Sequence, residues 1–177
     1  NDIIQKGIFI LENLEHRGAT GADPLVGDGA GMLTQIPHEM YREEMEKLSC
    51  FLPDLGGYGV GMFFFPKQVK YHTLIKRIIV KFSEEQGIKI LGWRDIPVDN
   101  ECLSKDKEIR EAEPIHVQGF FKKPEGMSEE DFERNLYVLR KKTTNKIYKE
   151  LGSEDLYYAV SLSSRTVVYK GMFLADQ

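Results

Sequence analysis

A glycine-rich segment near the start of the chain holds residue types that could take part in chemistry. It runs from Leu14 to Met32 with the sequence LEHRGATGADPLVGDGAGM. An apolar helical pattern ends at Gly18, a short loop with acids and glycines follows, and a strand begins near Met32. Five glycines in this stretch allow positive φ angles and let the backbone approach a ligand or another segment closely. This layout is typical of the edge of an active site.

Each polar residue of the segment also has an ordinary structural interpretation. Arg17 stands at the end of a predicted helix, where a cation interacts favourably with unpaired carbonyl groups. Asp28 before Gly29 is a common turn former. His16 could be a base or a metal ligand, but no second His or Cys stands at metal-binding spacing, which favours a helix-end histidine. From the residues alone, both the structural and the functional interpretations stay open.

Four ordered blocks of the sequence carry a family resemblance. They are LEHRGATGADPLVGDGAGMLTQIPHE from residue 14, YGVGM from residue 58, LGWRDIPVD from residue 91 and SLSSRTVVYKGM from residue 161. Together they resemble the type 2 glutamine amidotransferase domain of glutamate synthase large subunits. The resemblance implies an α+β fold of the N-terminal-nucleophile hydrolase type, a four-layer αββα sandwich, here incomplete.

The resemblance also implies a reaction. In such domains the thiol of an N-terminal Cys attacks the glutamine side-chain amide, its own α-amine acts as the base, ammonia leaves, and a thioester is hydrolysed. Residue one here is Asn1, and Cys50 and Cys102 cannot offer both a thiol and a free α-amine. The Asn-Gly pair of the family's oxyanion hole is not found in the sequence. We therefore expect these 177 residues to be an internal part of one domain, not competent alone.

The family's supporting residues carry over at a few positions. Arg17 matches the arginine beside the nucleophile, and Gly18 allows close approach there. Asp28, Gly29 and Gly31 match a loop near the same cleft. The expected site lining is therefore Arg17, Gly18, Asp28, Gly29 and Gly31, with no catalytic nucleophile and no metal ligand in this chain.

Composition limits the other classes of function. The net charge of −4 and the pI near 5.7 do not favour a nucleic-acid partner. The longest apolar run, residues 60–65, is far shorter than the roughly 20 residues that a membrane-spanning helix needs. No basic leader opens the sequence, so we expect a location in the cytoplasm or a plastid. Two cysteines favour free thiols, with a Cys50–Cys102 disulfide as the alternative.

Periodicity predicts alternating helices and strands. We expect a helix with a buried apolar face over 2–16, helices around 41–48 and 75–82, and a long helix from the Ser128 cap to Gly152. Strands are expected over 32–36, 59–65, 88–93 and 115–121, with a surface loop and one helical turn between Pro97 and Pro114. Residues 157–162 and 166–169 are expected to form a hairpin. The length predicts a single domain over 1–177.

Two classes of function follow. The first is a fragment of the ammonia-producing domain of glutamate synthase, which makes L-glutamate from glutamine and 2-oxoglutarate. The resemblance places FMN and an iron–sulfur cluster in other domains, so no cofactor is expected here, and the partner is the rest of the synthase. The second is a non-catalytic amidotransferase-like binding or regulatory module. A dinucleotide-binding domain is disfavoured because neither Gly-X-Gly pair continues to a third glycine before a helix.

Overall fold

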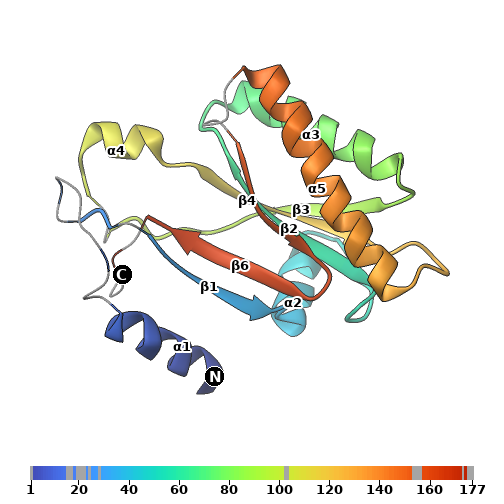
Figure 1. Cartoon of the computed structure of the whole chain (residues 1–177), viewed down its shortest axis with the longest axis horizontal. Coiled ribbons are helices and arrows are strands. Elements are labelled where there is room, and N and C mark those ends of the chain that lie inside the picture. The colour runs from blue at the N-terminus through green and yellow to red at the C-terminus, as the bar shows by residue number, and fades with distance from the viewer. Residues whose placement is uncertain are drawn as a thin grey trace. The chain divides into compact units, whose positions relative to one another are not determined.

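The computed structural model describes residues 2–14, 18, 23, 25–27, 29–101, 104–152, 157–172 and 174 (Figure 1). The elements are α1 Asp2–Asn13, β1 Ala30–Gln35, α2 His38–Lys47, β2 Tyr58–Phe65, α3 Val69–Glu84, β3 Lys89–Asp95, α4 Lys107–Ala112, β4 Ile115–Lys122, α5 Glu129–Leu151, β5 Tyr158–Ser163 and β6 Thr166–Gly171. Helices and strands alternate as far as β5, which β6 follows directly, and every pairing in the larger sheet is antiparallel. The chain is therefore a mixed α and β protein with antiparallel sheets.

The chain divides into two compact units. Unit 1 comprises residues 1–33, 98–113 and 168–177, and unit 2 comprises residues 34–97 and 114–167. Unit 1 contains α1 and α4, and unit 2 contains the four-stranded sheet with its helices. The single domain over 1–177 stays a prediction.

Unit 2 is built around a sheet with the strand order β3-β4-β2-β5. Strands β2 and β4 set the register, with Gly61 opposite Gly119. Helices α3 and α5 cover one face of the sheet and α2 packs on the other (Figure 1). The face under α3 and α5 carries an aromatic cluster in which the Phe63 ring lies 6.1 Å from the Trp93 ring and 6.2 Å from the Tyr157 ring. This face holds the larger of the two hydrophobic cores.

Helix α5 begins and ends as the sequence predicts. The Ser128 hydroxyl accepts a hydrogen bond from the Asp131 backbone N–H at 3.1 Å, so it caps the helix. The chain leaves the helix at Gly152, whose φ of 69° is the left-handed conformation that glycine adopts without strain. The apolar spacing is satisfied as well, because Phe132, Leu136 and Ile147 are fully buried.

Two predictions about local structure are wrong. The helix predicted over 2–16 is present as α1, but none of its described residues is buried, and Ile4 and Ile8 are 48% and 38% exposed. An amphipathic pattern favours a helix, and the Met32 side chain of β1 does lie against Gly7 of α1, but the large side chains of Ile3, Phe9 and Ile10 are exposed. The segments after residue 157 form no hairpin, because β5 pairs with β2 whereas β6 pairs with β1. The expected loop over 97–114 does contain one short helix, α4.

The connection between β5 and β6 is a turn that passes from one sheet to the other. The Ser163 hydroxyl accepts hydrogen bonds from the backbone N–H groups of Arg165 and Thr166, at 3.0 and 3.2 Å. The Glu133 carboxylate on α5 accepts from the backbone N–H and the hydroxyl of Ser164, at 2.8 and 2.7 Å. The Ser163 hydroxyl and the Glu133 carboxylate on α5 therefore both hold this turn. The sequence predicts a hairpin because it indicates a turn between two strands, but the two strands belong to different sheets.

We expect Glu133→Gln to destabilise the chain more at neutral pH than in acid. Burial raises the pKa of Glu133, but hydrogen bonds from Ser163 and Ser164 outweigh it, and the net pKa lies below the ordinary value of 4.5. Because the folded-state pKa is depressed, the ionised group contributes stability that is present above the unfolded-state pKa and is lost as the pH falls through the folded-state pKa. Urea denaturation of both proteins at about pH 7 and about pH 3 measures this. A difference in unfolding free energy that is the same at both pH values would contradict it.

Candidate functional site

The described part of the glycine-rich segment lies in unit 1 and contains a tight turn at Asp23. The Leu25 backbone N–H donates to Asp23 Oδ1 at 2.8 Å, and the Val26 N–H donates to the Asp23 carbonyl at 3.1 Å. The second carboxylate oxygen of Asp23 accepts a hydrogen bond from the Ser104 hydroxyl. The hydrogen bonds from Ser104 and then from the Leu25 N–H hold the pKa of the Asp23 carboxyl below its usual range. Asp23 is therefore an ionised anchor for the turn.

Two glycines of the segment, Gly29 and Gly31, lie very close to strand β6. Gly29 has a φ of +113°, and a Cβ built there would lie 3.1 Å from the Gly171 carbonyl oxygen. A Cβ on Gly31 would lie 2.6 Å from Lys170 Cβ and 2.8 Å from the Tyr169 carbonyl oxygen. No real side chain fits at the second position without a shift of backbone. The close approach expected from the glycines is thus present, and β1 and β6 bring the first and fourth blocks of the sequence together.

The structure places three of the five expected site residues. Gly29 directly precedes β1, Gly31 lies within β1, and Gly18 is an exposed residue in irregular backbone. Arg17 and Asp28 lie outside the described residues, as does His16. The structure therefore brings Gly29 and Gly31 together at one sheet, and the role of all five in lining a site stays a prediction.

Sequence reasoning missed the partner of Asp23. Ser104 is 3% exposed and stands 81 residues along the chain from Asp23. It lies in a stretch with polar composition that predicts a surface loop. The one local signal is the order Ser104, Asp106 and a short helix, because Asp106 Oδ1 accepts from the N–H groups of Glu108 and Ile109 and caps α4.

The third block contributes a buried polar network in unit 2. Arg94 is 9% exposed, and its guanidinium donates to Glu44 Oε2 at 2.9 Å and to Gln118 Oε1 at 3.0 Å. The Gln118 amide in turn donates to the Tyr41 hydroxyl at 2.8 Å. Hydrogen bonds from Lys47 and then Arg94 lower the pKa of Glu44. Since Glu44 and Tyr41 lie on α2, the network fixes this helix to the sheet.

The second block begins with a buried tyrosine. The Tyr58 hydroxyl lies 3.0 Å from His38 Nδ1, and the side chain is fully buried between α2 and the sheet. Burial, with a smaller effect of the Glu39 charge, raises the pKa of Tyr58 to about 12. The phenol is therefore protonated at neutral pH and acts as a packing and hydrogen-bonding group.

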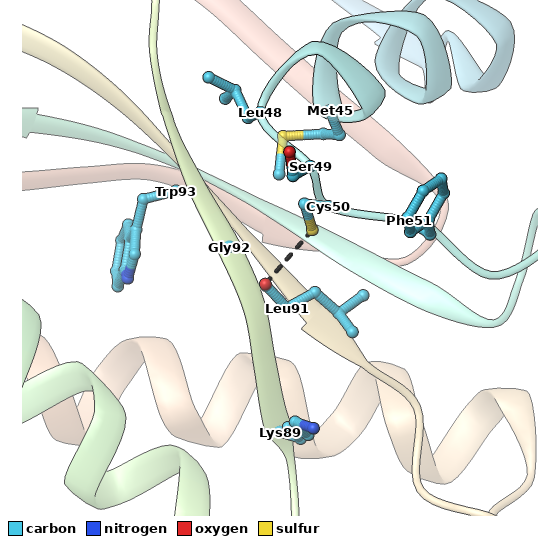
Figure 2. A pocket seen from close by; sticks show the side chains of 9 residues that line it. All are labelled: Met45, Leu48, Ser49, Cys50, Phe51, Lys89, Leu91, Gly92 and Trp93. Carbon is cyan, nitrogen blue, oxygen red and sulfur yellow. Dashed lines mark hydrogen bonds between the residues drawn. The ribbon is translucent and has the colours of Figure 1, made fainter.

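A pocket of about 440 Å³ lies in unit 2 between the end of α2 and β3 (Figure 2). Figure 2 shows Cys50 directed toward β3, where its thiol donates to the Leu91 carbonyl at 3.3 Å. Burial raises the pKa of the Cys50 thiol, so the reactive thiolate is disfavoured. That Cys50 is not the nucleophile stays a prediction. Cys50 is a free thiol, as expected, so the alternative disulfide with Cys102 is not formed; Cys102 itself lies outside the described residues.

Two features are absent from the part of the chain that the structure describes. Among the helices there, none is both long and apolar enough to cross a membrane. Within the same ranges, no three His, Cys, Asp or Glu side chains gather in a way that could hold a metal ion.

Comparison with known proteins places the whole sequence in one family. Residues 1–177 match the family described as "Glutamine amidotransferases class-II". The chain is 38% identical to the NADPH glutamate synthase large chain of Bacillus subtilis over 179 residues, which are 100% of this chain and 11% of that protein. It is 36% identical to the NADH glutamate synthase of Schizosaccharomyces pombe, over 99% of this chain and 8% of that protein.

A plant relative is also similar over nearly the whole chain. The chain is 33% identical to the chloroplastic ferredoxin-dependent glutamate synthase 2 of Arabidopsis thaliana, over 98% of this chain and 10% of that protein. The chain thus spans about a tenth of the length of these curated relatives. On the match over its full length, the chain belongs to the class-II glutamine amidotransferase family.

Proposed function

We propose that this chain is part of the ammonia-producing domain of a glutamate synthase. The complete protein would transfer the amide nitrogen of glutamine to 2-oxoglutarate and form L-glutamate. The observation that carries the proposal is the family match over residues 1–177, together with relatives that are all named glutamate synthase. The names of these relatives give NADPH, NADH and ferredoxin as electron donors, so the donor is left open.

In the proposed reaction, a cysteine thiol at the mature N-terminus attacks the side-chain amide carbon of glutamine. Ammonia leaves, and water hydrolyses the resulting thioester to glutamate. The raised pKa of Cys50 and its bond to the Leu91 carbonyl support an assignment of the nucleophile outside this sequence. The residues of this chain would then shape the cleft around that nucleophile.

The proposed cleft lining is Arg17, Gly18, Asp28, Gly29 and Gly31. The close packing of Gly29 and Gly31 against Tyr169–Gly171 supports it, because it holds the backbone of the first block beside that of the fourth, and both blocks carry the family resemblance. We also propose that the two sheets belong to a four-layer αββα sandwich of the N-terminal-nucleophile hydrolase type. The antiparallel pairing of the larger sheet and the cover of one of its faces by α3 and α5 support this fold.

The cofactors of the proposed synthase belong to other parts of the polypeptide. An iron–sulfur cluster is held by about four cysteine thiolates, and this sequence has two cysteines, one of which is bonded to a backbone carbonyl. The residues present do not fit a cluster, and no step of glutamine hydrolysis here uses one. FMN is likewise assigned to other domains, and the remainder of the synthase is the proposed partner. The proposed location is the cytoplasm or a plastid.

Glutamine hydrolysis by the complete polypeptide that contains this sequence tests the proposal. We expect release of ammonia and glutamate from glutamine, and loss of this activity after thiol alkylation. The double variant Cys50→Ser, Cys102→Ser is the control, and it should keep both the activity and the sensitivity to alkylation. Loss of hydrolysis in the double variant would contradict the assignment of the nucleophile. A complete polypeptide that releases no ammonia would favour the non-catalytic module instead.

A further inference from the structure

A continuous path of hydrogen bonds joins α4 to the glycine-rich segment within unit 1. The Asp106 side chain caps α4, and the Asp106 backbone N–H donates to the Ser104 hydroxyl oxygen at 3.1 Å. The Ser104 hydroxyl hydrogen is donated to Asp23 Oδ2, and Asp23 Oδ1 accepts from Leu25. Ser104 therefore acts as donor and acceptor at once, with its side chain buried.

A further contact holds Asn100 to α4, the helix that follows Ser104. The Arg110 guanidinium on α4 donates to the Asn100 carbonyl at 2.5 Å, and it lies 3.9 Å from the Glu113 carboxylate. These contacts join the two ends of residues 98–113. We call the described residues Ser104, Asp106 and α4 the brace, because their hydrogen bonds connect α4 to Asp23.

We propose that Ser104 is a positioning residue for the glycine-rich segment, acting through the Asp23 carboxylate. The hydroxyl fixes the turn of Asp23, Leu25 and Val26, and Gly29 and Gly31 follow this turn closely in the chain. The functional part of this inference rests on the proposed glutamine hydrolysis. Ser104 touches neither nucleophile nor substrate in the proposal, and its effect is to hold the segment that borders them.

Ser128 provides a matched control in unit 2. Its hydroxyl also accepts from the backbone N–H of a residue near a helix start, Asp131, and donates to a carboxylate, Asp131 Oδ2 at 2.8 Å. Ser104→Ala and Ser128→Ala therefore each remove one hydrogen bond from a backbone N–H and one hydrogen bond to a carboxylate. Only the first deletion releases the glycine-rich segment.

Glutamine kinetics of the complete polypeptide test the proposal. We expect Ser104→Ala to lower kcat/KM by about tenfold through a higher KM, while Ser128→Ala keeps the wild-type KM. A partly unfolded sample would lower kcat with the active fraction and leave KM unchanged, so the KM separates positioning from stability. In an Asp23→Ala background, Ser104→Ala should change KM no further. An unchanged KM in Ser104→Ala, or additive effects of the two changes, would overturn the proposal.

Amide hydrogen exchange provides a readout that needs no activity. We expect the Leu25 amide to exchange faster in Ser104→Ala than in the wild type or Ser128→Ala, because its acceptor is no longer held. If the complete polypeptide hydrolyses no glutamine, the proposed function fails, and exchange at Leu25 still decides whether Ser104 braces the turn. Equal exchange of the Leu25 amide in all three proteins would overturn the proposal that Ser104 holds the Asp23 turn.

Discussion

Phe63→Ala is expected to lower the free energy of unfolding by about 4 kcal/mol. Phe63 is fully buried on β2, and its ring lies 6.1–6.3 Å, centroid to centroid, from the rings of Phe65, Trp93 and Tyr157. The Tyr157 ring is stacked on it, with 21° between the two planes. The Phe63 ring lies over Gly61, so its loss opens a cavity beside a residue that has no side chain to fill it. Denaturant unfolding monitored by the fluorescence of Trp93 measures the loss.

Phe51→Ala is the control for that measurement. The Phe51 side chain is 77% exposed, so the same truncation should change the unfolding free energy by less than about 0.5 kcal/mol. Equal losses in the two variants would mean that the aromatic cluster under α3 and α5 is not the centre of the core.

Gly31→Ala is expected to cost about 2 kcal/mol because the added methyl group overpacks a closed contact. Its Cβ would stand 2.8 Å from the Tyr169 carbonyl oxygen, a backbone atom that can move only if β1 and β6 separate. In the complete polypeptide we also expect a loss of glutamine hydrolysis, since the shift would displace the proposed cleft lining at Gly29. Thermal unfolding and the ammonia-release assay measure the two effects.

Leu33→Ala provides the comparison on the same strand. Leu33 lies two residues further along β1, on the same side, and is 64% exposed. Its truncation should leave both stability and hydrolysis near the wild-type values. If Gly31→Ala behaves like Leu33→Ala, the close approach of β1 and β6 is not required.

Local signals predicted the helices and strands of unit 2 well. The start of α5 could be predicted because Ser128 offers a capping hydroxyl, and its end because Gly152 accepts the left-handed conformation. Strand β2 could be predicted from its apolar run, which the structure buries between two layers of helices. In each case the information lies within a few residues of the element.

Contacts between distant residues could not be predicted in this way. The sequence around Ser164 favours a hairpin, but β6 pairs with β1, more than a hundred residues earlier, and Glu133 holds the turn. The hydrogen bond between Ser104 and Asp23 joins residues that are 81 positions apart, and no periodic pattern in the sequence indicates it. The helical spacing of α1 gives its conformation but not its burial, which depends on what packs against it.

The residues of the candidate site show the same difference between local signals and contacts of distant residues. The glycines could be identified from sequence because close approach of the backbone restricts the residue type directly, as Gly31 shows against Tyr169. The role of Asp23 could not be identified from sequence, because Asp28 and Glu15 in the same segment are also acidic and no local pattern distinguishes Asp23 from them. What distinguishes Asp23 is a buried hydroxyl from another segment, and only the fold supplies it.

Covalent labelling by a glutamine analogue tests the central claim most directly. The complete polypeptide that contains this sequence is incubated with a diazoketone analogue of glutamine, which alkylates a thiolate that attacks the side-chain position, and the labelled residue is identified by peptide mass spectrometry. We expect one label on a cysteine at the mature N-terminus, blocked by excess glutamine, with Cys50 and Cys102 unlabelled. A glutamine-protected label on Cys50 or Cys102, or no protected label at all, would contradict the account.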